Sequence, residues 1–160
     1  MDYADIDKRL MKSTAKDAAE TLVSKIDDPT DRLHGDLFYR KKPRVKSQSF
    51  GGYPYIHLDG VNIINSNASA DGTLVEFTVD IELHVWGRED TEDGPEDADA
   101  IVSQLLYLLT GPEKANLSEG TGMTAPNIIR NVDFTGINQK DQPVTRQEME
   151  FRTTIHKVMA

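Results

Sequence analysis

The chain has 160 residues, a net charge of −9 and no cysteine. This length is typical of one domain with a substantial core, and we predict a single domain over residues 1–160. The lack of cysteine excludes disulfides and thiolate metal sites. No apolar run reaches the roughly 20 residues that span a bilayer, and the charged N-terminus lacks the apolar core of a signal peptide. We therefore expect synthesis in the cytoplasm and no membrane partner, and the acidic balance disfavours non-specific binding to nucleic acid.

Residues 4–26 are predicted to form a helix, because apolar residues recur at four-residue steps from Ile6 to Ile26. The sequence DDPT at residues 27–30 ends it. Such a terminal amphipathic helix packs onto its own sheet or, as the less favoured alternative, onto a neighbouring subunit.

A basic segment follows a possible short strand at residues 37–39. It is defined by five cations with no acid between them: Arg40, Lys41, Lys42, Arg44 and Lys46. The segment is interpreted as a solvated loop docked on acidic residues of the same fold, or as a contact with an acidic partner. That partner would be the acidic loop of a sister subunit rather than a phosphate backbone, because aromatic residues are not regularly interleaved with the charges.

The strand pattern begins after a predicted turn at residues 50–54. Residues 55–58 are predicted to enter a strand, Asp59-Gly60 is a typical hairpin signal, and residues 61–65 would form the return strand. The longest pattern covers residues 73–86, where the odd positions from 75 to 85 are apolar and the even positions from 76 to 84 are polar. It predicts a long strand with one buried face, antiparallel to the strand before it.

An acidic segment, residues 89–99, comes next. Its acids are Glu89, Asp90, Glu92, Asp93, Glu96, Asp97 and Asp99. An EF-hand alignment places Ala100 where a glutamate ligand is required, so a calcium loop is excluded. We predict a solvated loop and then a helix over residues 96–109, whose apolar face lies across the buried face of the sheet.

The C-terminal third is predicted to contain a loop at residues 113–126, a strand at 127–134, a polar turn at 136–143 and a final strand at 144–158. In the final strand, Met149, Phe151, Thr153 and Ile155 share one face. The predicted fold class is therefore α+β: a mainly antiparallel sheet with an N-terminal helix and a second core helix packed on one face.

Catalytic and metal-binding patterns are missing from the sequence. The four histidines, at positions 34, 57, 84 and 156, form no close HxH or HxxxH pair. The nucleophile motif GxSxG and the phosphate-binding motifs GxGxxG and GxxxxGK[ST] do not occur. We expect a protein that is not an enzyme and has no catalytic residues, no bound metal and no cofactor.

The order of elements and three short motifs carry a resemblance to a known family. The motifs are Tyr53-Pro54-Tyr55-Ile56 at a strand entry, His84-Val85-Trp86 near the end of the long strand, and the apolar helix at residues 98–109. With them, the chain resembles the tail terminator family (tail completion or tail-to-head joining proteins) of long-tailed phages and tailed archaeal viruses. The resemblance covers most of the chain, but neither the basic segment nor residues 113–126.

The resemblance implies a structural virion protein, located in the tail at the neck. Such a protein forms a homo-oligomeric ring of six subunits that caps the tail tube, stops its polymerisation and joins the tail to the neck or head. The implied partners are its own copies, the tail tube protein and a neck or head-closure protein, while genome DNA passes through the ring without specific binding. Pro54 would set the entry angle of an edge strand, and Trp86 would fill the end of the core.

Under this resemblance the two charged segments suggest a subunit interface. In a head-to-tail ring, the basic segment of one subunit would face the acidic segment of the next, because heterologous interfaces pair two different patches. Two other classes of protein stay open. One is another neck or tail subunit, such as a head-closure, adaptor or tube protein, and the other is a small cellular ligand-binding α+β protein.

Overall fold

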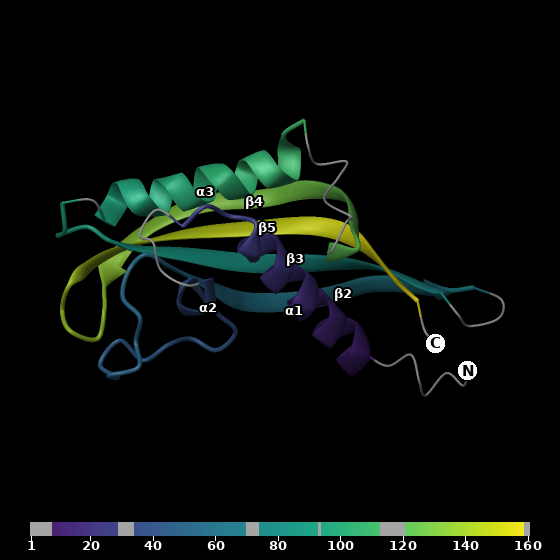
Figure 1. Cartoon of the computed structure of the whole chain (residues 1–160), viewed down its shortest axis with the longest axis horizontal. Coiled ribbons are helices and arrows are strands. Elements are labelled where there is room, and N and C mark those ends of the chain that lie inside the picture. The colour runs from purple at the N-terminus through teal and green to yellow at the C-terminus, as the bar shows by residue number, and fades with distance from the viewer. Residues whose placement is uncertain (1–7, 29–33, 70–73, 93, 113–120, 159–160) are drawn as a thin grey trace.

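The computed structural model describes residues 8–28, 34–69, 74–92, 94–112 and 121–158. Its elements in chain order are α1 (Lys8–Ser24), α2 (His34–Leu37), β1 (Phe38–Tyr39), β2 (Tyr55–Ala68), β3 (Leu74–Arg88), α3 (Gly94–Thr110), β4 (Met123–Ile137) and β5 (Pro143–Val158). The strands form one sheet in the order β1-β2-β3-β5-β4 (Figure 1). The pairing of β1 with β2 is parallel, and the other pairs are antiparallel.

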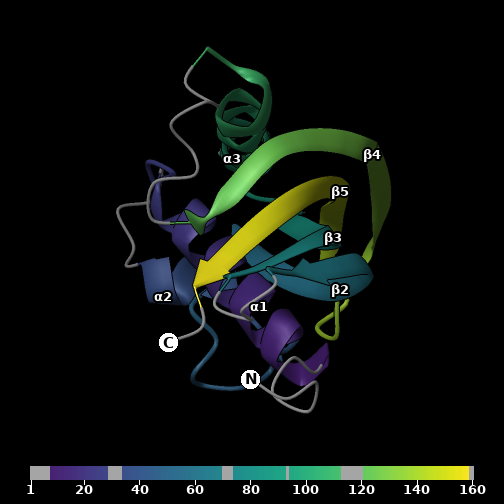
Figure 2. The same ribbon diagram turned by 90° about the vertical axis from the view of Figure 1, so that its right-hand side faces the viewer.

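Both long helices cover the same face of the sheet, which curves around them (Figure 2). The apolar faces of α1 and α3 join the odd-numbered residues of β3 in one hydrophobic cluster. Each of these residues from Val75 to Val85 is at most 2% exposed, so the alternation in the sequence correctly predicts the buried face. The α+β class, with two helices on one face of a mainly antiparallel sheet, is confirmed.

Helix α3 begins and ends within two residues of its predicted bounds, and α1 ends two residues before its predicted end. Residues 4–7 of the first predicted helix lie outside the described residues. Helix α3 buries Ala98, Ile101, Val102, Leu105 and Leu109. The side chain of Gln104 accepts a hydrogen bond from the Asp27 backbone N–H (2.6 Å) and donates one to the Asp27 carbonyl (2.9 Å), which ties α3 to the end of α1. None of the helices among the described residues is long and apolar enough to cross a membrane.

The hairpin predicted at Asp59-Gly60 is wrong. Strand β2 continues through both residues to Ala68, and its register against β3 shifts between Leu58 and Gly60. Asp59 is thus the extra residue of a β-bulge, a feature that accepts the same Asp-Gly sequence as a tight turn. The long partner strand decides between the two, because a turn here would leave the far half of β3 without its neighbour. The connection between β2 and β3 falls at residues 70–73, outside the described residues.

The loop predicted over residues 113–126 is also partly wrong, since β4 already begins at Met123. Residues 113–120 of that prediction lie outside the described residues. Bulges interrupt the register with β5 between Thr124 and Asn127 and between Ile128 and Arg130, and Ala125 has a φ of 48°. These irregularities interrupt the alternation of apolar and polar residues, so the alternation in the sequence does not indicate where the strand begins.

Candidate functional site

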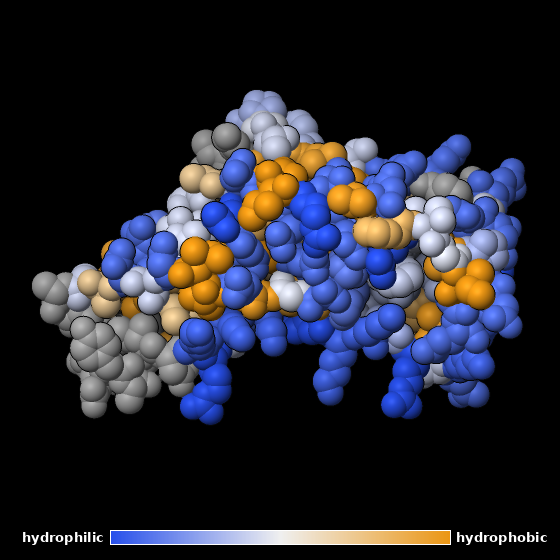
Figure 3. All heavy atoms as spheres, turned by 180° about the vertical axis from the view of Figure 1, so that it is seen from behind, coloured by the Kyte–Doolittle hydropathy of each residue, from blue (hydrophilic) through white to orange (hydrophobic). Residues whose placement is uncertain are grey.

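The face of the sheet turned away from the helices, here called the outer face, is mainly hydrophilic with separate apolar patches (Figure 3). It is formed by the even-numbered residues of β3 and β5, which the register sets opposite one another. Asp80 lies opposite Arg152, and the Arg152 guanidinium donates to both carboxylate oxygens at 2.8 and 3.1 Å. Charges of opposite sign on neighbouring strands stabilise the pairing of β3 with β5.

Arg130 of β4 is the central cation of the outer face. Its guanidinium bonds the Glu82 carboxylate of β3 and, at 2.9 Å, the Glu148 carboxylate of β5. Arg146 adds a second contact to Glu148 at 3.0 Å. This arrangement explains how two acids of an acidic chain lie next to each other on a sheet, because each carboxylate has a guanidinium partner.

Two histidines lie next to this network. His57 of β2 and His84 of β3 are cross-strand partners, only 8% and 6% exposed, with ring centroids 6.2 Å apart. Burial lowers the pKa of both imidazoles, although the Asp59 carboxylate acts in the opposite direction. The fold therefore assembles two histidines that are 27 positions apart in sequence, a proximity that no spacing motif indicates.

Trp86 lies on the outer face rather than in the hydrophobic cluster between sheet and helices. Its ring stacks on Tyr55 at a centroid distance of 5.9 Å and an interplanar angle of 13°. Lys42 Nζ and the Arg146 guanidinium lie 5.4 and 5.5 Å from the centre of the indole. The even position of Trp86 in β3 explains this, because successive side chains of a strand point to opposite faces.

Pro54 is buried directly before β2 and follows a cis peptide bond with Tyr53. On this side of β2, the described residues provide one pairing partner, the two-residue strand β1, at Ile56 and His57. The role of Pro54 in setting the entry angle stays a prediction.

The basic segment divides into a docked end and a free part. Arg40 donates to Asp17 of α1 at 2.6 Å and also bonds Glu20, and these contacts raise its pKa. Lys41, Arg44 and Lys46 are exposed and form no ion pair among the described residues. Docking within the same fold thus applies to Arg40, while the other cations remain accessible to a partner.

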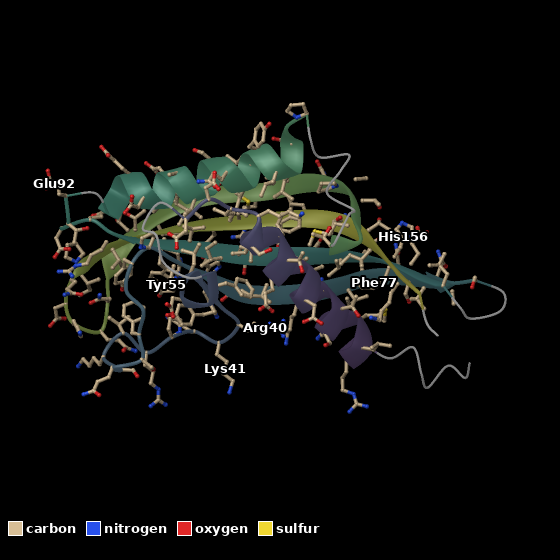
Figure 4. All side chains as sticks on the ribbon, in the orientation of Figure 1. Arg40, Lys41, Tyr55, Phe77, Glu92 and His156 are labelled. Carbon is tan, nitrogen blue, oxygen red and sulfur yellow. The ribbon has the colours of Figure 1, made fainter. Side chains whose placement is uncertain are left out.

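The acidic segment divides in the same way. Arg88 binds Asp90 through two hydrogen bonds of 2.5 and 3.0 Å, and Glu89 accepts one from the Thr145 hydroxyl at 2.6 Å. Glu92 is exposed without a partner among the described residues. Asp93 lies outside the described residues. Figure 4 shows Glu92 at one end of the molecule and Lys41 projecting from a different side, so one subunit presents them as separate patches.

Strand β4 forms an open edge of the sheet. Its residues 131–137 are exposed, and they include Val132, Phe134 and Ile137, the last of which is 69% exposed. A hollow of about 200 Å³ lies beside this edge, between Trp86, Phe134 and Ile137. Unpaired strand edges and exposed apolar side chains are typical of surfaces that pair with another chain. These residues were not predicted as a contact surface, although Val132 and Phe134 lie in the strand predicted at residues 127–134.

Comparisons with known proteins bear on the fold. No family model and no curated protein matches the chain. The chain is similar to a chain in a solved structure of the virion of a native gene transfer agent particle. The TM-score is 0.55 and the sequence identity 16%, and the match covers 91% of this chain and 97% of the other. At this identity, the likeness shows that the two chains share a fold over almost their whole lengths.

Proposed function

We propose that this protein is a structural, non-enzymatic component of a virion, and more specifically a ring-forming tail terminator. In this role it caps the tail tube at the neck, stops its polymerisation and joins the tail to the neck or head. The fold shared with a virion chain over 91% of the sequence is the observation that carries the proposal. The resemblance of the Tyr53–Ile56 and His84–Trp86 motifs to tail terminators points in the same direction.

The open edge at β4 supports self-assembly. The sheet is also unusually long, because strands β3 and β5 have 15 and 16 residues, against a usual strand length of five or six. The exposed apolar side chains of β4 and the hollow beside Trp86 give this edge a surface that a neighbouring subunit would cover. Closing such contacts around a rotation axis makes a ring that leaves no edge unpaired.

The charged segments supply the second half of the proposed interface. The free cations Lys41, Arg44 and Lys46 of one subunit would face Glu92 and its neighbours on the next. Opposite patches of this kind set the register and the rate of encounter more than the affinity. The apolar edge would then contribute most of the binding free energy.

Electron microscopy of the purified protein and of native particles tests the proposal. A six-fold ring at the end of a tube is the expected result. A twelve-fold ring would make the protein an adaptor of the neck, and a stacked helical assembly would make it the tube subunit. A protein that stays monomeric when mixed with tail tubes, and that is missing from particles, would contradict a virion role.

A further inference from the structure

We propose that the outer face carries a binding site for one divalent transition-metal ion such as Zn²⁺, with His57, Asp59 and His84 as its ligands. The three side chains come from one cross-strand pair and the bulge beside it. Their ligand atoms lie within 4.8 Å of one another. All three ligands belong to one subunit, so the site can be tested on the isolated chain.

The separations between the polar atoms are slightly longer than those of atoms that share an ion. His84 Nε2 lies 3.7 Å from Asp59 Oδ2, and His57 Nδ1 lies 3.9 Å from Asp59 Oδ1. Both distances are too long for hydrogen bonds. Ligand atoms at bond lengths of 2.0–2.1 Å around a tetrahedral Zn²⁺ are about 3.4 Å apart, so the observed spacing needs only small side-chain movements.

The imidazole of His84 points to a missing ligand. Its Nε2 atom is buried and has no hydrogen-bond partner among the described residues, although three carboxylates surround it at 3.4 to 3.7 Å. Buried polar atoms in proteins almost always have a partner. A buried imidazole nitrogen that is surrounded by carboxylates, with no hydrogen-bond partner among the described residues, is the arrangement that a cation completes.

The surrounding charges select Asp59 as the carboxylate ligand. Glu82 and Glu148 are already bound by Arg130 and Arg146. Within the part of the chain that the structure describes, Asp59 has no lysine or arginine side chain bound to it, and its ionic contacts are those to the two histidines. Glu82 Oε2, 3.4 Å from His84 Nε2, remains as a neighbour that can orient the imidazole or accept from a bound water.

The donor set selects the type of metal. The charged groups that face the two histidines from the surrounding elements are Asp59, Glu82, Glu148, Arg130, Arg146 and Lys42. Ca²⁺ and Mg²⁺ are hard cations that take oxygen ligands, so a set with two imidazoles disfavours them. Two imidazole nitrogens and one carboxylate instead suit Zn²⁺ and its neighbours in the first transition series. Asp59 is 43% exposed in its side chain, which leaves the ion an open side for water.

The test is a titration of the metal-free full chain with ZnCl₂ at pH 7.5, followed by calorimetry and thermal unfolding. We expect one Zn²⁺ per chain, a higher unfolding temperature, and a visible absorption spectrum of tetrahedral type when Co²⁺ replaces Zn²⁺. Asp59→Asn should weaken Zn²⁺ binding at least tenfold. This variant should fold, because Asp59 is exposed and outside the core. His57→Gln should have the same effect, and binding should weaken below pH 6 as the imidazoles become protonated.

His156→Gln is the matched control, because His156 lies on β5 away from the site and contacts Glu76 at 3.6 Å (Figure 4). Its Zn²⁺ binding should equal that of the unchanged protein. The proposal would be overturned by a chain that binds no Zn²⁺, as expected if a water molecule satisfies His84. A Zn²⁺ affinity in Asp59→Asn and His57→Gln that equals that of the unchanged protein would overturn it as well. So would a rise in unfolding temperature with Ca²⁺ equal to that with Zn²⁺.

Discussion

Tyr55 and Trp86 stack face to face across the β2–β3 pair, with their ring planes only 13° apart. Tyr55 is buried to 1% exposure, and its burial raises the pKa of the phenol. The rings of Tyr39, Phe50 and Tyr53 pack around it at centroid distances of 5.4 to 5.6 Å. A second, aromatic core therefore lies at the end of the sheet where the basic segment begins.

Removing the indole should destabilise this aromatic core. We expect Trp86→Ala to lower the free energy of unfolding by about 1–3 kcal/mol, because a half-buried aromatic side chain loses both apolar burial and its stacking partner. Chemical denaturation followed by far-ultraviolet circular dichroism measures the change. Tyr107→Ala, on the exposed side of α3, should change the value by less than about 0.5 kcal/mol. Equal losses in the two variants would contradict the packing role of Trp86.

Two phenylalanines separate the contributions to folding and to assembly. Phe77 is 1% exposed and lies in the core (Figure 4). Phe134, in contrast, is 40% exposed on the open edge. Phe77→Ala should lower the free energy of unfolding by about 3–5 kcal/mol, because truncating a buried phenylalanine to alanine leaves a cavity in the core. Phe134→Ala should cost less than about 1 kcal/mol and should weaken self-association, as measured by analytical ultracentrifugation. A variant at Phe134 that assembles normally would exclude this edge from the interface.

Charge reversal tests the proposed contact between subunits. Lys41→Glu combined with Arg44→Glu should reduce ring formation and leave thermal unfolding of the monomer unchanged, because neither side chain has an ion partner among the residues that the structure describes. Lys12→Glu with Lys16→Glu, on the exposed side of α1, is the control of equal charge change. Added salt should weaken assembly of the unchanged protein by screening the same charges. Rings that persist in the first variant at low salt would refute the pairing.

Arg130 should stabilise the outer face through its two carboxylate partners. Arg130→Met leaves Glu82 and Glu148, whose side chains are 18% and 10% exposed, without their shared cation. We expect a loss of about 1–3 kcal/mol, because a largely buried carboxylate without its partner keeps its desolvation cost. Arg152→Met should lower the free energy of unfolding by less, because the Arg152 side chain is more exposed. Urea denaturation of the two variants at one pH measures both losses of unfolding free energy. A larger loss in Arg152→Met than in Arg130→Met would contradict the prediction.

The buried histidines should make stability depend on pH. Because burial lowers the pKa of His57 and His84 in the fold, the unfolded chain binds more protons below its ordinary histidine pKa of about 6.5. The free energy of unfolding of the metal-free chain should therefore decrease as the pH falls from about 7 toward 5. Denaturation at a series of pH values, with chelator present, measures this slope. The double variant His57→Gln, His84→Gln should have a flatter profile, and an unchanged slope would contradict the prediction.

The periodic patterns of β3, α3 and β5 are local, and the sequence alone was sufficient to predict them. Burial of one face sorts apolar from polar side chains at period two in a strand and 3.6 in a helix, and each pattern is long enough to be unambiguous. The same local logic failed at Asp59-Gly60, because an Asp-Gly pair suits a turn and a bulge equally well. It also missed the start of β4, where two bulges break the alternation.

The sequence thus determined the fold class, the buried face of the sheet and the location of the charged segments. The tertiary structure decided which of these charges are free, because Arg40 finds its partners on α1 and Asp90 finds its partner at Arg88. It alone brought His57, Asp59 and His84 together. The physical reason is that contacts between strands depend on register, which distant segments and bulges set jointly and no local spacing records.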